Sequence, residues 1–168
     1  SLSAKQIEKW KKNDAVISRS EQIFQAFLER LDERGQLYEE QDIRITPEFI
    51  LNHTLTHLLI QQMSLSSGYN SASIKERIFS GGENPQMNGS LIFTGTSDSD
   101  GTLGGLARLA ETDYFVQLVH DVVSEAQWCS SDPLCFDGII STSESLNNAA
   151  CHSCALLPET SCEYFNCF

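Results

Sequence analysis

The stretch Cys151–Cys162, CHSCALLPETSC, places three cysteines close together near the end of a chain of 168 residues. The first 128 residues contain no cysteine at all. Whatever the thiols do is therefore local to the C-terminal part of the chain. The last 40 residues hold all six cysteines: Cys129, Cys135, Cys151, Cys154, Cys162 and Cys167.

The spacing of these cysteines is typical of a structural zinc site. Cys151 and Cys154 form a C-x2-C pair, which turns two thiolates toward one point, and two more thiolates close a tetrahedral site with no open position. Such a site stabilises the fold, because the unfolded chain does not preform it. We predict that Cys162 is the third ligand of a bound Zn²⁺. For the fourth ligand we prefer Cys129 over Cys135, because Cys129 follows a predicted helix.

Two other uses of the cysteines are less consistent with the sequence. A disulfide framework would suit an even number of cysteines, but disulfide-rich domains are usually small, exported and have cysteines throughout the fold. A redox dithiol at CHSC would be expected at the start of a helix after a strand, and it needs no further cysteines. We expect His152, between the two cysteines, to point to solvent.

The composition is that of a globular protein. Apolar residues make up 40% of the chain, and the length suits one domain with an appended helix. The apolar runs are too short for a membrane span, and the N-terminus SLSAKQIEKWKK lacks the apolar stretch of a signal peptide. We therefore expect a cytoplasmic protein without membrane contacts. The start at SLSAKQ and the stop at NCF suggest a piece of a larger protein.

The net charge of −12 is unevenly distributed. Residues 1–34 hold seven Lys or Arg against six Asp or Glu, whereas residues 35–168 hold four against seventeen. Because phosphates are neutralised by Lys and Arg, the C-terminal part is not expected to grip nucleic acid by itself. An alternative function as a DNA-binding module would depend on the N-terminal cluster of Lys9, Lys11 and Lys12.

The hydrophobic pattern predicts helices around a small sheet. Residues 4–34 read as one helix that stops at Gly35, and the acidic stretch GQLYEEQD after it predicts a division between residues 1–40 and 41–168. Thr46 is expected to cap a second, largely apolar helix that ends at Gly68. The segments SIKERIF and SLIFTGT alternate as the strands of a hairpin, and a last amphipathic helix leads to Cys129. The predicted fold class is mixed α/β (α+β), with helices packed on a small sheet or hairpin and a C-terminal four-cysteine zinc site.

Two further groups could carry chemistry. His53 and His57 stand four residues apart, a spacing that lets two imidazoles share a metal, but no third ligand is evident and hydrogen-bonded polar groups are the preferred interpretation. The loop TSDSDGTLGG lacks the ligand expected at position 12 of a calcium loop and the Lys-Ser/Thr of a phosphate loop. A nuclease-like cation site at Asp98 and Asp100, with one of the histidines, is left as an alternative.

Four segments together are similar to a known family: HTLTHLLI, SLIFTGTSDSDGTLGGLARLAE, WCSSDPLC and AACHSCALLPETSCE. They resemble the MrfA-type zinc-binding domain, found at the C-terminal end of certain superfamily II DNA helicases, in the version carried by the B subunit of the DISARM anti-phage system. The resemblance implies that residues 41–168 are such a domain. It also implies a zinc site whose best-matching positions are Cys129, Cys151, Cys154 and Cys162, while Cys135 matches in the DISARM-like branch.

The resemblance further implies an accessory or scaffold role in a DNA-processing complex for anti-phage defence or DNA repair. The chain has no Walker motif, so it is not expected to be the ATPase itself. The implied partner is a helicase subunit or a helicase domain of a larger protein. DNA would then be reached through the complex.

Overall fold

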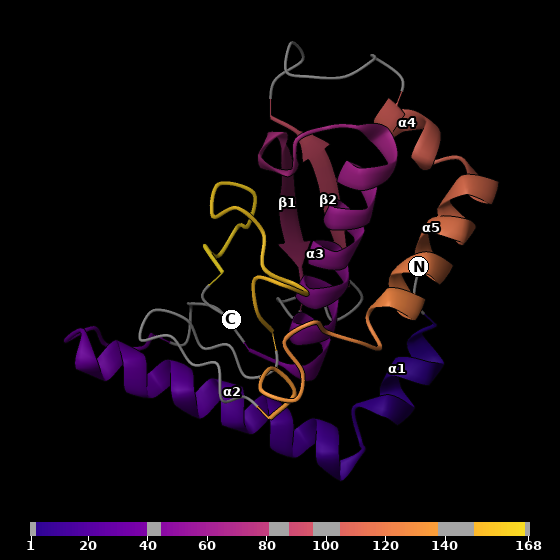
Figure 1. Cartoon of the computed structure of the whole chain (residues 1–168). Helices are drawn as coiled ribbons and strands as arrows, with labels where there is room; N and C mark the ends of the chain where they lie inside the picture. Colours follow the sequence, from indigo (N-terminus) through magenta and orange to yellow (C-terminus); the bar gives the residue numbers. More distant parts are fainter. Residues whose placement is uncertain (1–2, 40–44, 81–87, 96–104, 138–149, 167–168) are drawn as a thin grey trace. The chain divides into compact units, whose positions relative to one another are not determined.

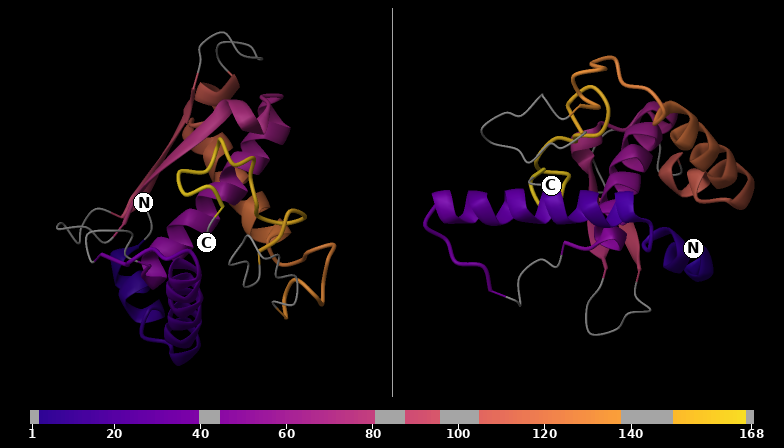
Figure 2. Two further views of the ribbon diagram at one scale, coloured as in Figure 1. Left: turned by 90° about the vertical axis from the view of Figure 1, so that its left-hand side faces the viewer. Right: turned by 90° about the horizontal axis from the view of Figure 1, so that it is seen from below.

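A computed structural model describes residues 3–39, 45–80, 88–95, 105–137 and 150–166 (Figures 1 and 2). The chain forms two compact units, one of Ser1–His53, Ile78–Ser90 and Phe168, the other of Thr54–Arg77 and Leu91–Cys167. In the described part, no helix is both long and apolar enough to cross a membrane. The elements in chain order are α1 (Ala4–Trp10), α2 (Asp14–Glu33), α3 (Pro47–Ser67), a short 3₁₀ turn (Ser71–Ser73), β1 (Ile74–Phe79), β2 (Gly89–Thr94), α4 (Gly105–Leu109) and α5 (Thr112–Glu125).

The expected mixture of helices and a hairpin is confirmed. β1 and β2 form a two-stranded antiparallel sheet, and they run side by side in Figures 1 and 2. Buried and exposed side chains alternate along β1, as the sequence IKERIF predicts. Residues that share the buried face of β1 therefore include Glu76 between two isoleucines.

The N-terminal helix differs from the prediction, because residues 4–34 form two helices rather than one. The helix is interrupted before Asn13, which caps α2. Its side-chain oxygen accepts a hydrogen bond of 2.9 Å from the backbone N–H of Ala15. Asparagine favours such capping positions because its side chain competes with the helical backbone for hydrogen bonds. The predicted stop at Gly35 is confirmed, since α2 ends at Glu33 and Gly35 has a φ of +65°.

Helix α3 begins and ends where the sequence predicts. The Thr46 hydroxyl accepts a 3.2 Å hydrogen bond from the backbone N–H of Phe49, and Pro47 occupies the first helical position. Gly68 follows the last residue with a φ of +73°. Together these signals set the two ends of α3.

The core of the second unit lies between α3, α5, β1 and the C-terminal segment. Ile60 and Ile74 have no exposed surface, and Leu118 and Val122 supply the buried stripe of α5. Phe115, one turn earlier on α5, is 40% exposed. Leu157 enters the same core from the C-terminal segment, three residues after Cys154. The full buried cluster consists of Leu59, Ile60, Met63, Ile74, Leu118, Val122 and Leu157.

Candidate metal centre

Two loops bring four cysteines together in the second unit. Cys129 and Cys135 lie in the loop after α5, and Cys151 and Cys154 lie at the start of the C-terminal segment. Their sulfur atoms all lie within 4.8 Å of one another. We call Cys129, Cys135, Cys151 and Cys154 the four-cysteine cluster.

The spacing of the sulfurs fits a tetrahedral zinc ion. The Sγ–Sγ distances are 3.6 Å between Cys129 and Cys151, 3.8 Å between Cys135 and Cys154, and 3.8 Å between Cys151 and Cys154. A tetrahedron with Zn–S bonds of about 2.3 Å has edges of about 3.8 Å. The residues present therefore match the size and donor type of a structural zinc site, and zinc would hold the two loops together.

Backbone N–H groups point at the sulfurs of the cluster. The N–H of Ser131 donates to Cys129 Sγ at 3.4 Å, and the N–H of Ser153 donates to Cys151 Sγ at 3.4 Å. The N–H of Cys151 donates to Cys154 Sγ at 3.2 Å. Hydrogen bonds of this kind stabilise negative charge on sulfur, as a thiolate ligand requires.

The thiols of the cluster differ in their acidity. Burial acts to raise the pKa of Cys151, but hydrogen bonds from the Ser153 N–H and from neighbouring thiols lower it to about 6. Burial raises the pKa of Cys154 to about 11 and raises that of Cys135 as well. One thiolate therefore forms readily, whereas four adjacent thiolates require a cation to offset their repulsion.

Asp132 organises the loop that carries Cys129 and Cys135, and the sequence analysis did not identify it. One carboxylate oxygen accepts a 2.9 Å hydrogen bond from the N–H of Cys129, and the other accepts a 3.2 Å bond from the N–H of Phe136. The signal in the sequence is an Asp-Pro pair between two cysteines, which is typical of a tight turn.

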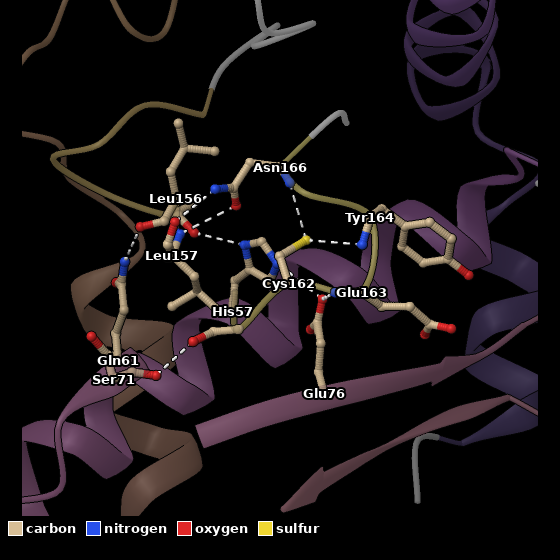
Figure 3. A network of polar contacts seen from close by, with 12 residues as sticks. His57, Gln61, Ser71, Glu76, Leu156, Leu157, Cys162, Glu163, Tyr164 and Asn166 are labelled. Atoms are coloured by element: carbon tan, nitrogen blue, oxygen red, sulfur yellow. Dashed lines mark hydrogen bonds and ion pairs between the residues drawn. The ribbon is translucent and has the colours of Figure 1, made fainter. Parts of the chain in front are cut away.

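Cys162 lies outside the four-cysteine cluster, contrary to its predicted place as third ligand. The structure brings Cys129, Cys151 and Cys154 together as predicted, but Cys135 completes the group. The reason is spatial: Cys162 is held beside α3 and β1, where it forms a different group with His57 and Glu76 (Figure 3).

The predicted histidines are both buried. His57 Nδ1 is 2.9 Å from the carbonyl oxygen of Ala155, and Nε2 is 3.2 Å from Glu76 Oε1. The ring of His53 packs against Phe49 with 5.6 Å between ring centroids. His152 is exposed, as expected. The cation site proposed at Asp98 and Asp100 lies outside the described residues.

Residues 55–155 match the sequence model of the MrfA Zn-binding domain. The chain belongs to the MrfA Zn-binding domain family. All four cysteines of the cluster fall inside the matched range, which ends before Cys162. Zinc is thus the metal that both the family and the sulfur geometry indicate.

One relative matches almost the whole chain. The chain is 39% identical over 162 residues to the DISARM protein DrmB of Bacillus paralicheniformis, an alignment that covers 95% of the chain. It spans only 28% of the length of that protein. The family resemblance that the sequence indicated is confirmed.

Proposed function

We propose that this chain is a zinc-stabilised accessory domain that serves as a scaffold in a DISARM-type anti-phage defence complex, beside a helicase subunit. The observation that carries the proposal is the four-cysteine cluster, whose sulfurs stand at tetrahedral spacing inside the range matched by the zinc-binding family. The 39% identity to a DISARM protein supports the defence context. We place its action in the cytoplasm, where thiols stay reduced and available to zinc.

A scaffold role follows from the donor set of the cluster. Four thiolates fill the coordination sphere of zinc and leave no position for a water or a substrate. Cys129, Cys135 and Cys151 are also buried, so the metal would be shielded from solvent. A zinc ion held in this way contributes to architecture rather than to turnover.

The charge distribution favours protein contacts over a direct grip on DNA. Among the candidate DNA contacts, Lys11 Nζ lies 2.6 Å from Glu8 Oε1 and 2.9 Å from Glu48 Oε1. Hydrogen bonds to these two carboxylates raise the pKa of Lys11 and offset its positive charge. Lys9 and Lys12 alone would make a weak electrostatic contact, because each phosphate contact contributes separately through counterion release. We therefore propose that DNA is reached through the helicase partner.

The proposal predicts that loss of the zinc site disrupts assembly with the helicase. The Cys135→Ser variant of the whole defence protein should lose the zinc of the four-cysteine cluster, should fail to co-purify with the helicase of its own defence locus, and should no longer protect cells from phage. His152→Ala is the matched control, because His152 lies between two zinc ligands but is exposed. It should keep zinc, partner and protection.

Metal analysis, co-purification and a phage-challenge assay would measure these outcomes. Zinc loss without any loss of helicase binding or protection would overturn the scaffold role. Full zinc retention in Cys135→Ser would overturn the assignment of Cys135 as a ligand.

A further inference from the structure

We propose that His57, Glu76 and Cys162 form a second zinc site, separate from the four-cysteine cluster. Each residue offers one ligand atom, and these atoms lie within 4.8 Å of one another. The three side chains come from three segments: α3, β1 and the C-terminal segment (Figure 3). All three are at most 5% exposed, so they form a buried group of nitrogen, oxygen and sulfur donors.

The imidazole of His57 is oriented as in a metal ligand. A carbonyl oxygen can only accept, so Nδ1 carries the proton and donates it to Ala155 O at 2.9 Å. Metal-bound histidines commonly donate one ring N–H to a backbone carbonyl in this way, which presents the other nitrogen to the metal. Here Nε2 lies 3.2 Å from Glu76 Oε1. Nitrogen and oxygen ligands on one tetrahedral zinc ion are about 3.4 Å apart, given bonds of about 2.1 Å.

The turn around Cys162 repeats a feature of the four-cysteine cluster. The N–H of Tyr164 donates to Cys162 Sγ at 3.4 Å, the same relation between residues two apart that Ser131 and Ser153 show to their cysteines. A second N–H, from Asn166, donates to Cys162 Sγ at 3.2 Å. Two such bonds favour the thiolate form that binds metal.

The side chain of Asn166 fixes this turn against the core. Its Oδ1 accepts from the N–H of Leu157 at 3.3 Å, and its Nδ2 donates to the carbonyl of Leu157 at 2.6 Å. Gln61 of α3 donates to the neighbouring carbonyl of Leu156 at 3.3 Å (Figure 3). The sulfur of Cys162 is therefore held in place rather than free to turn away.

Charge balance also favours a divalent cation. A thiolate and a carboxylate carry two negative charges, which a zinc ion neutralises while the imidazole stays neutral. Mixed nitrogen, oxygen and sulfur donors suit zinc better than calcium or magnesium, which prefer oxygen alone.

The proposed site contains His57, one of the two histidines that the sequence spacing singled out. His53 precedes His57 by four residues on the continuous helix α3, and side chains four residues apart share one face of a helix. The further ligands that His57 lacked in the sequence thus come from β1 and the C-terminal segment. Such a site would attach the C-terminal segment to α3.

The zinc content of the 168-residue chain tests this proposal. The wild type should bind about two zinc ions per chain, and Glu76→Gln should bind about one, since a neutral amide is a poor zinc ligand. Glu163→Gln is the matched control. Its carboxylate pairs with Arg77 at 3.0 Å, and the substitution keeps the backbone N–H that donates to Glu76 Oε1. This variant should keep both ions.

Cobalt substitution separates the two sites and reports on folding. The charge-transfer absorption of a four-thiolate cobalt site should persist in Glu76→Gln and disappear in Cys135→Ser. A wild-type chain with one zinc ion, or a Glu76→Gln variant with unchanged zinc content, would overturn the second site. Either result would leave the four-cysteine cluster and its proposed function intact, because those depend on the Cys135→Ser result.

Discussion

Replacing Cys151 with serine is expected to remove the zinc of the four-cysteine cluster and to unfold much of the second unit. Cys151 Sγ lies 3.6 Å from Cys129 Sγ and 3.8 Å from Cys154 Sγ, so it joins the two loops. Structural zinc contributes about 10–16 kcal/mol of binding free energy in zinc-finger peptides, as much as the whole stability of many domains. We expect the free energy of unfolding to fall by about 5 kcal/mol or more.

Metal analysis and denaturant unfolding of the purified chain would measure this loss. Ser153→Ala is the control, because it removes an exposed hydroxyl contact with Ser131 but keeps the backbone N–H that points at Cys151 Sγ. It should cost less than about 1 kcal/mol. A chelator should lower the stability of the wild type toward that of the Cys151→Ser variant. An unchanged unfolding midpoint after zinc removal would contradict the structural role.

Local signals in the sequence predicted most element boundaries correctly. Thr46 and Gly68 limit α3 because a hydroxyl cap and a positive φ are properties of single residues and their immediate neighbours. The alternation of IKERIF gave β1 for the same reason. The helix boundary at Asn13 was not predicted, because apolar residues recur at helical spacing on both sides of it. In the structure the Asn13 side chain caps α2 and a new helix begins there.

Which residues gather into each group of possible metal ligands depends on distances in space. Spacing along the chain does not determine these distances. Cys135 and Cys162 were both near enough in sequence to join the C-x2-C pair, and the structure selects Cys135. The sequence did contain a signal for the group of His57, Glu76 and Cys162, but it was not recognised. Glu76 lies on the buried face of an alternating strand, where a carboxylate needs a buried partner, and the paired histidines of α3 lacked a third ligand.

Replacing Ile60 with alanine is expected to produce the second-largest loss of stability, by about 3 kcal/mol. Ile60 has no exposed surface and belongs to the core cluster that includes Ile74 and Leu157, so its removal would leave a cavity between α3 and the C-terminal segment. Leu65→Ala is the control on the same helix. Leu65 is 77% exposed, and its loss should cost less than about 0.5 kcal/mol.

Urea unfolding of the zinc-loaded chain, combined with zinc affinity, would show whether the core positions the metal. Leu157 packs in the core and lies three residues after Cys154. A rigid core should therefore preset the C-x2-C pair for zinc, and Ile60→Ala should weaken zinc binding as well as the fold. Leu65→Ala should change neither. Ile60→Ala could instead lose stability but bind zinc as tightly as the wild type. That result would show that the core does not organise the four-cysteine cluster. Its own loops would do so, through Asp132 and the N–H groups at the sulfurs.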